Sequence, residues 1–220
     1  MHFNALRRCS AQFGSFSRLL ANAKYANLSA NCRPLSFGTL FRARENAEDT
    51  AETENPVDVA RLDLRVGRVV SVLKHPNADS LFISHVDLGE SQPRTVIAGL
   101  VKYIGVEQLQ NRLVVCLCNM RPSKMRGIVS HAMILCASTQ EKVEPLELTD
   151  QSCKPGSLIV CDNFGRQPDK VLRKNNWELI ASDLRVSDTG DCVFKGNSLR
   201  VDGDVSSPLT APTLRNVPIK

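Results

Sequence analysis

Apolar residues recur at strand-like spacing from residue 61 onward. Four valines between residues 66 and 72 predict a long first strand, in which Gly67 marks a bend or bulge. Further apolar runs, separated by turn residues such as the His75–Asp79 cluster, predict four more strands and one short helical connector. The strands are expected at 81–86, 95–100, 112–118 and 128–137, and the connector at 106–110. Five short strands suit a small closed barrel, although periodicity alone does not fix the topology.

Residues 143–220 show a mixed pattern instead. Apolar residues recur at helical spacing between Trp177 and Leu184, after an Asn175–Asn176 pair that can cap a helix. Two short apolar runs flank Lys195-Gly196-Asn197 and predict a hairpin of strands at 192–194 and 198–201. These elements predict a smaller α+β region, which could extend the barrel or form an independent appended domain.

The stretch between the last two predicted strands carries the most distinctive chemistry. Leu117–Ser130 reads LCNMRPSKMRGIVS and places Arg121, Lys124 and Arg126 on one short loop, where Gly127 permits a turn. Arginine grips phosphates as a two-pronged fork, and lysine acts as a mobile point charge. The loop is therefore a candidate phosphate-binding element. A solvated basic turn is the competing interpretation of the charge alone.

Charge is unevenly distributed along the 220 residues. Residues 1–44 contain seven cations and no acid, and residues 45–60 contain six acids and no cation. Residues 61–142 carry eleven cations against six acids, a net charge of +5, whereas residues 143–220 carry ten against eleven, a net charge of −1. The predicted barrel is thus the basic part of the folded chain, and this favours a polyanion as its partner.

The N-terminal residues 1–44 have the composition of a mitochondrial transit peptide. They are rich in Arg, Ser and Ala and can form an amphipathic helix with an apolar face that includes Leu6 and Phe13. We therefore expect the mitochondrial matrix as the location, with the cytoplasm as the alternative if this stretch is only a disordered basic tail. Residues 45–56 are expected to form an acidic linker. No uninterrupted apolar stretch is long enough to span a membrane.

Three long stretches carry a resemblance to a known family. They are RLDLRVGRVVSVLKHPNADSLFISHVDLGE at 61–90, PRTVIAGL at 93–100 and LQNRLVVCLCNMRPSKMRGIVSHAMILCAS at 109–138. Together they closely resemble the tRNA-binding domain of the endothelial monocyte-activating polypeptide II type, which also forms the C-terminus of animal tyrosyl-tRNA synthetase. Residues 143–220 look like the C-terminal extension of that polypeptide. Two departures are visible, because Met120-Arg121 stands where Leu-Lys is common and Asn77 where Asp is common.

The resemblance implies a mainly β protein, in which a five-stranded oligonucleotide-binding barrel at 57–142 carries a smaller α+β extension at 143–220. It implies a monomer, since the extension would cover the surface that bacterial relatives use to dimerise. It also implies that the loop between the last two barrel strands binds tRNA. Carried over by position, the RNA-binding residues are Asn119, Arg121, Lys124, Met125, Arg126, Gly127 and Ser130, with Lys74, His75 and Arg94 as additions from neighbouring rims.

Recognition is expected to rest on phosphates and shape. Residues 61–142 contain only Phe82 and Tyr103 as aromatic residues, so this stretch nearly lacks the stacking platform of a general single-strand binder. Phosphate contacts position a protein on a nucleic acid, and folded RNA is recognised largely by its shape. Base readout should therefore be minor.

Catalysis is not expected. Ser84-His85 and Ser130-His131 are neighbours on predicted strands, so the side chains of each pair point to opposite faces and cannot act as nucleophile and base. The eight cysteines form no recognisable ligand set, and neither a metal nor another cofactor is expected. Cys116, Cys118 and Cys136 are instead expected to pack as buried thiols.

The predicted function is that of a non-catalytic tRNA-binding protein, acting in trans as a cofactor of an aminoacyl-tRNA synthetase or another tRNA-handling enzyme. The alternative is a cytokine-like or scaffold role in protein interaction. It is suggested by RVGRVVS at 65–71, which resembles the proposed active heptapeptide of the related polypeptide. The same seven residues equally suit a barrel strand.

Overall fold

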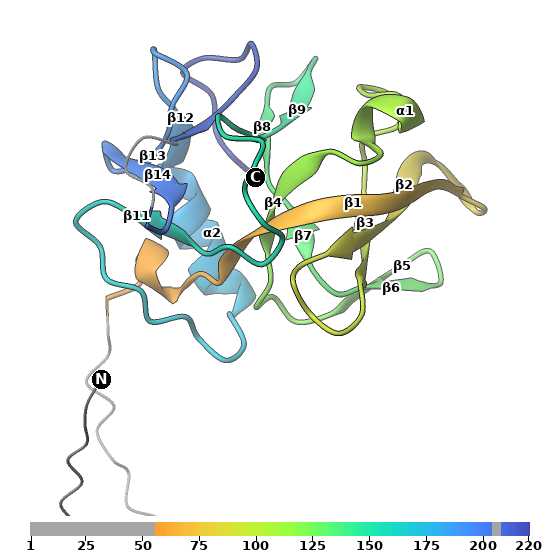
Figure 1. The fold of residues 1–220 in the computed structure, drawn as a ribbon, viewed down its shortest axis with the longest axis horizontal. Helices are drawn as coiled ribbons and strands as arrows, with labels where there is room; N and C mark the ends of the chain where they lie inside the picture. Colours follow the sequence, from red (N-terminus) through yellow and green to blue (C-terminus); the bar gives the residue numbers. More distant parts are fainter. Residues whose placement is uncertain (1–55, 204–207) are drawn as a thin grey trace, which may run out of the picture. The chain divides into compact units, whose positions relative to one another are not determined.

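The computed structural model describes residues 56–203 and 208–220 (Figure 1). The predicted transit peptide at 1–44 lies outside the described residues, as does the acidic linker up to residue 55. Within the described ranges, no helix is long and apolar enough to cross a bilayer. The described chain begins with a short 3-10 turn, Val59–Arg61, which leads into the first strand.

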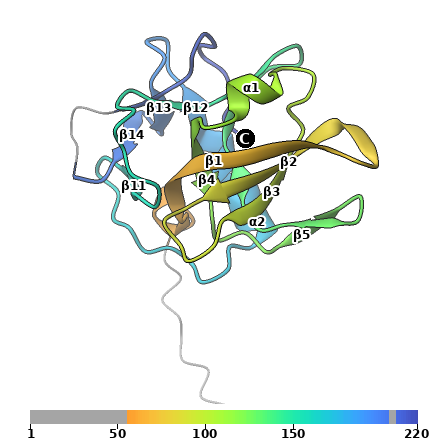
Figure 2. The same ribbon diagram turned by 45° about the vertical axis from the view of Figure 1, so that its right-hand side comes forward.

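Five strands form an antiparallel sheet in the order β3-β2-β1-β4-β7 (Figures 1 and 2). A one-turn helix, α1, connects β3 to β4. The prediction of a mainly β protein is therefore confirmed. The bounds are β1 (Leu64–His75), β2 (Ala78–Asp87), β3 (Arg94–Ala98), α1 (Val106–Leu109), β4 (Leu113–Leu117) and β7 (Met133–Ile134).

Two hydrogen bonds join the opposite edges of this sheet. The backbone N–H of His131 donates to the carbonyl of Thr95 at 2.9 Å, and the N–H of Ile97 donates to Oγ of Ser130 at 3.0 Å. Both bonds run from β3 to the segment directly before β7. An edge strand that finds partners in this way no longer presents free backbone groups to another chain.

The prediction of one continuous fifth strand at 128–137 is wrong. This stretch consists of three short strands, each with a different partner. An alternating apolar pattern fixes which face of a strand is buried, but not which neighbour it pairs with. The three pieces are β6 (Ile128–Ser130) paired with β5 (Ser123–Met125), β7 paired with β4, and β8 (Cys136–Ser138) paired with β9 (Val143–Pro145).

Gly67 has a role other than the predicted bulge. The register of β1 against β2 shifts between Val69 and Ser71, whereas Gly67 pairs regularly with Val114 on β4. A Cβ atom at residue 67 would lie only 2.5 Å from Cγ1 of the buried Val86. Glycine is therefore needed here because β2 side chains pack directly over the β1 backbone.

The extension is built from short strands and one long helix, α2. Four strands form a second sheet in the order β11-β14-β13-β12. The hairpin predicted around residue 196 is confirmed, with Lys195 and Gly196 at positive φ in its turn. The predicted Asn175–Asn176 cap is wrong, because Arg173 is the N-cap residue of α2. The bounds are β10 (Glu147–Leu148), β11 (Ile159–Cys161), α2 (Lys174–Asp183), β12 (Leu184–Val186), β13 (Cys192–Phe194), β14 (Asn197–Val201) and β15 (Leu209–Thr210).

Strand β4 is buried on both faces, which is why all five of its residues are apolar. Alternate residues belong to different clusters. Val114 and Cys116 face the inside of the first sheet, whereas Leu113, Val115 and Leu117 pack against the extension. The extension contributes Ile159, Ile180, Leu199, Leu209 and Ile219 to that second cluster. The first sheet and the extension thus share this second cluster as a common core.

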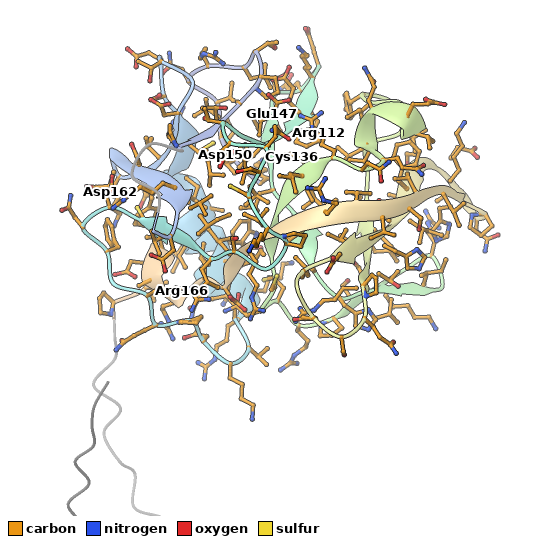
Figure 3. All side chains as sticks on the ribbon, viewed as in Figure 1. Arg112, Cys136, Glu147, Asp150, Asp162 and Arg166 are labelled. Atoms are coloured by element: carbon orange, nitrogen blue, oxygen red, sulfur yellow. The ribbon has the colours of Figure 1, made fainter. Side chains whose placement is uncertain are left out.

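Polar contacts join the same two regions. Nη2 of Arg112, just before β4, lies 2.6 Å from Oε1 of Glu147 on β10 (Figure 3).

Cys116, Cys118 and Cys136 are buried in the inner cluster, as predicted. Burial raises the pKa of both the Cys118 and the Cys136 thiols to about 12, so these cysteines stay protonated and serve as packing groups.

Candidate nucleic-acid interface

The predicted basic loop is a projecting β-hairpin. Strands β5 and β6 pair in register, from Ser123 with Ser130 to Met125 with Ile128. The two-residue turn between them consists of Arg126 at φ 48° and Gly127 at φ 104°. Positive φ at both central residues is what a type I′ turn requires, and this turn matches the right-handed twist of the strands that it joins. The turn predicted at Gly127 is confirmed.

The three cations of this hairpin lie at three separate places. Arg121, Lys124 and Arg126 are all exposed, and none of them forms an ion pair or side-chain hydrogen bond with another described residue. Ser123 and Met125 face a pocket near α2, so Lys124 between them points to the opposite face of the strand. Arg121 lines that pocket, and Arg126 occupies the tip. The charges thus extend along the hairpin instead of converging on one spot.

Asn119 is a structural residue in this fold. Its side chain is buried and makes three hydrogen bonds. Oδ1 accepts from the backbone N–H of Asp63 at 3.1 Å, and Nδ2 donates to the carbonyls of Arg61 and Asp169 at 2.9 and 3.0 Å. Its own carbonyl accepts from the N–H of Leu172 at 2.7 Å. Asn119 therefore ties the start of the hairpin to the extension, and its amide is fully used within the protein.

Arg94 and Ser130 are also engaged internally. Nη1 of Arg94 donates to the carbonyls of Cys118 and His131, at 2.9 and 3.3 Å, and its guanidinium forms a two-pronged pair with Glu90. The hydrogen bond from Arg94 lowers the pKa of Glu90, although burial opposes this effect. Oγ of Ser130 is buried, accepting from Ile97 and donating to the carbonyl of Ala132 at 2.9 Å. Both side chains hold the two ends of the hairpin in place.

The pair with Glu90 belongs to a chain of alternating charges that reaches the extension. Nη1 of Arg65 lies 3.6 Å from Oε1 of Glu90, and its Nη2 lies 2.8 Å from Oδ2 of Asp63. Oδ1 of Asp63 in turn accepts from Nη2 of Arg166 at 2.6 Å. The hydrogen bond with Asp63 raises the pKa of Arg65. The chain supports the base of the hairpin from one side.

The remaining predicted residues lie around the β1–β2 turn. Lys74 is exposed, whereas His75 is buried and its Nδ1 accepts from the backbone N–H of Asn77 at 3.0 Å. Asn77 and residues 78–81 at the start of β2 line a hollow of about 590 Å³ together with Arg126. Lys102 also lines this hollow. The sequence did not indicate Lys102 as a site residue, because a single lysine after a strand carries no motif.

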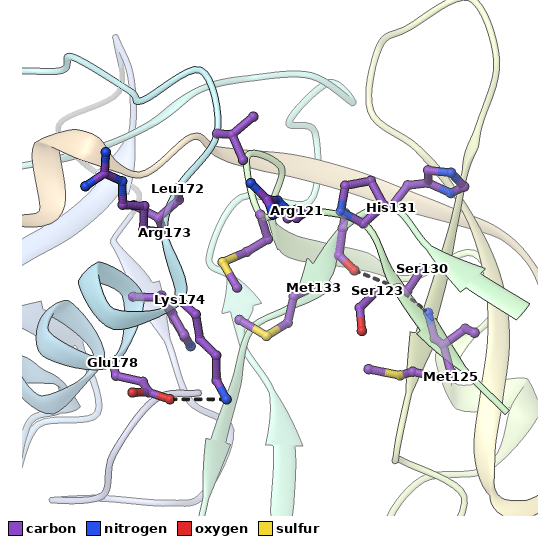
Figure 4. A pocket seen from close by; sticks show the side chains of 16 residues that line it. Arg121, Ser123, Met125, Ser130, His131, Met133, Leu172, Arg173, Lys174 and Glu178 are labelled. Atoms are coloured by element: carbon purple, nitrogen blue, oxygen red, sulfur yellow. Dashed lines mark hydrogen bonds and ion pairs between the residues drawn. The ribbon is translucent and has the colours of Figure 1, made fainter.

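A larger pocket of about 820 Å³ separates the hairpin from α2 (Figure 4). Arg121 and Met125 of the hairpin and Met133 of β7 line one side. The other side is formed by residues 171–174 and by Trp177 and Glu178, before and within the first turns of α2. Arg173, Lys174 and Trp177 come from that side, and the positive N-terminal end of the helix adds to their charge. Sequence reasoning did not include these residues in the site, because the spacing of Trp177 indicated only a packed helix.

The histidine of the Ser84-His85 neighbours contacts a serine on another strand. Nδ1 of His85 lies 2.9 Å from Oγ of Ser71 on the adjacent strand, a pairing that the sequence did not indicate. The heptapeptide at 65–71 lies in β1 between β2 and β4, with Val66, Gly67 and Val69 buried.

Comparisons with known proteins agree with this architecture. A family model described as a putative tRNA binding domain matches residues 64–157. The cytoplasmic methionine–tRNA ligase of Caenorhabditis elegans is 48% identical over 172 residues, which are 77% of this chain and 18% of the ligase. The aminoacyl tRNA synthase complex-interacting multifunctional protein 1 of Cricetulus griseus is 48% identical over 178 residues, which are 80% of this chain and 48% of that protein. The chain thus spans less than half the length of either relative.

A solved structure is similar over the whole of its own length. The crystal structure of the C-terminal domain of Plasmodium vivax p43 superimposes with a TM-score of 0.69 at 30% sequence identity. The match covers 75% of this chain and 100% of that domain.

Proposed function

We propose that this chain, which belongs to the family of putative tRNA-binding domains, binds tRNA and catalyses no reaction on it. The observation that carries the proposal is the set of three exposed cations on the β5–β6 hairpin, which have no acidic partner among the described residues. Cations that are not neutralised within the protein are available to phosphates. Their spread along a rigid hairpin suits an extended phosphate backbone better than a single small anion.

The surrounding fold supports the same assignment. The sheet order and the hydrogen bonds between its edges support the proposal of an oligonucleotide-binding barrel, in which the hairpin would lie between the last two barrel strands. Arg94 and Asn119 hold the ends of the hairpin through buried or charge-assisted hydrogen bonds. A preorganised hairpin loses little conformational freedom when RNA binds, so more of the contact energy contributes to affinity.

The names of the relatives indicate the setting in which such binding would act. One relative is a tRNA ligase, and another is named as interacting with an aminoacyl tRNA synthase complex. We infer that this chain acts in trans as a tRNA-binding cofactor of an aminoacyl-tRNA synthetase, and that it does so as a monomer. Its location is proposed to be the mitochondrial matrix. A fusion of residues 1–50 to a fluorescent protein should enter mitochondria, and diffuse cytosolic fluorescence would refute this location.

Salt dependence of binding tests the phosphate contacts. Log affinity falls as log salt rises, and the salt slope is taken here as the magnitude of that fall. Each lost contact should lower this magnitude by roughly 0.9 for duplex RNA, with B-DNA as the reference, and by roughly 0.7 for single strands. Replacing Arg121, Lys124 and Arg126 together by Ala should therefore lower the slope by about 2 to 3 and weaken binding to different tRNAs about equally. An unchanged slope in a folded triple variant would refute the proposed surface.

The second hairpin of the protein supplies a matched control. Lys195 and Gly196 form a turn with φ values of 49° and 80°, nearly the backbone of the Arg126–Gly127 turn, but on the extension. Lys195→Ala therefore removes one cation from an equivalent turn outside the proposed interface. It should leave the salt slope unchanged, whereas Arg126→Ala alone should lower it by about 0.9.

A further inference from the structure

We propose that the pocket between the β5–β6 hairpin and α2 holds one unstacked nucleotide of the bound RNA, with its base against Trp177 and its phosphate among the cations at the rim. This inference rests on the proposed function and specifies the ligand of an adjoining site. It assigns part of RNA recognition to the extension, whereas the sequence placed all of it on residues 61–142.

The pocket has the size and lining that a nucleobase requires. Its volume of about 820 Å³ lies within the range of roughly 300–1,000 Å³ typical of small-ligand sites. Its apolar lining includes Trp177 and the thioether side chains of Met120, Met125 and Met133. Aromatic rings stack on bases whatever their sequence, and polarisable sulfur atoms pack well against ring edges. A flat aromatic group therefore fits this lining.

The charge at the rim selects an anion. Arg121, His131, Arg173 and Lys174 line the pocket, and Glu178 is the only acidic residue among the side chains that line it. Nζ of Lys174 lies 3.7 Å from Oε1 of Glu178, and both side chains are largely exposed, so this pair is weak and leaves the rim positive (Figure 4). A ligand with a flat apolar ring and a negative group matches both features, and a nucleotide has both.

Backbone contacts within the protein connect the two sides of the pocket. Leu172 donates its N–H to the carbonyl of Asn119, and the adjacent Met120 forms an isolated parallel bridge with Leu172. These bonds join the hairpin side of the pocket to the α2 side. The site is therefore formed before the ligand arrives, and its walls need not reorganise on binding.

Neither of the two aromatic side chains of residues 61–142 can take this role. Phe82 is 1% exposed and lies in the inner core. Tyr103 is 39% exposed but lines neither of the two hollows described above. Trp177 thus supplies the stacking surface that residues 61–142 lack.

Fluorescence gives a direct test, because Trp177 is the only tryptophan of the whole chain. The full chain is titrated with tRNA, with a short unpaired oligoadenylate and with a blunt RNA duplex, while tryptophan emission is recorded. We expect tRNA and oligoadenylate to quench the emission. The duplex should bind through the hairpin cations without quenching, because its bases are stacked and paired. tRNA binding with unchanged emission would overturn the inference.

Two substitutions at the same position separate stacking from packing. Trp177→Leu removes the ring, and affinity for oligoadenylate should fall about 5- to 150-fold, the range expected when one stacked base loses its aromatic partner. Trp177→Phe keeps an aromatic ring and should retain most of the affinity. Leu179→Ala changes an exposed residue of the same helix that does not line the pocket, and it should have no effect. Equal affinities of the Trp177→Leu variant and the wild type would overturn the inference.

The outcomes distinguish this inference from the proposed function. Binding of tRNA that depends on Lys124 and Arg126 but not on Trp177 would overturn the nucleotide pocket and leave the proposed function standing. Failure to bind any RNA would refute both. Quenching by an acidic peptide such as polyglutamate, but not by oligoadenylate, would assign the pocket to a protein partner and would also overturn the inference. A thermal melt of each variant shows whether the affinities compare folded proteins.

Discussion

Replacing Asn119 by Ala should destabilise the protein strongly, although the sequence placed this residue among the RNA contacts. The substitution removes three buried side-chain hydrogen bonds, from the N–H of Asp63 and to the carbonyls of Arg61 and Asp169. Each such bond contributes about 0.5–1.5 kcal/mol net, so the three together contribute about 3 kcal/mol to the free energy of unfolding. For a folded region of this size, that corresponds to a fall in Tm of about 6–12 °C.

Urea unfolding and a thermal melt, both followed by circular dichroism, measure this effect. Arg121→Ala, two residues further along, is the matched control and should change the free energy of unfolding by less than about 0.5 kcal/mol, because its side chain is exposed. The salt slope of RNA binding should stay at the wild-type value for Asn119→Ala at a temperature where it is folded, since no phosphate-binding cation is lost. A stable Asn119→Ala variant with a lowered salt slope would refute the structural role and restore the RNA contact.

Two further predictions concern packing and pH. Gly67→Ala should lower the free energy of unfolding by about 1–3 kcal/mol, because the new Cβ would overlap Val86. Gly99→Ala is the control and should change it little, because its Cβ would have its nearest neighbour at 3.8 Å. Equal urea midpoints for the two variants would contradict this prediction. Burial opposes ionisation of Glu144, but hydrogen bonds from Lys142 and Thr213 outweigh it and lower its pKa from 4.5 to about 2. Because the folded pKa is the lower one, Glu144 stabilises the protein above pH 4.5, and this contribution is lost as the pH falls towards 2. Glu144→Gln should therefore lose less stability than the wild type between pH 4.5 and pH 2, which urea midpoints measured across that range will test.

The sequence predicted the strands well where apolar alternation was long and bounded by turn residues. The first four strands, the hairpin around residue 196 and the turn at Gly127 all appear close to their predicted positions. The pairing of each piece within 128–137 could not be predicted, because alternation reports which face is buried and not which neighbour is present. The crowding at Gly67 was hidden for a similar reason. It depends on Val86, a residue of another strand.

The candidate site was predicted less completely, and the reason is the direction of its side chains. Asn119, Ser130 and Arg94 are polar residues near the loop, and their identity alone does not reveal that they form hydrogen bonds within the protein. The exposed Arg121, Lys124 and Arg126 were predicted correctly as surface cations. Trp177 and Lys102 each line a hollow beside the hairpin only because of the fold, since neither lies in the loop or carries a motif.

The two-sided burial of β4 limits how this protein can be divided or recombined. Leu113, Val115 and Leu117 face the extension, while Val114 and Cys116 between them face the inner cluster. A fusion or excision at the boundary near residue 142 would therefore leave three large apolar side chains of a central strand without a covering layer. The proposed RNA-binding surface can be grafted onto another protein only together with the extension. The amide protons of β4 should also be among the slowest in the chain to exchange with solvent, because β4 lies between β1 and β7 in the first sheet and is covered on both faces.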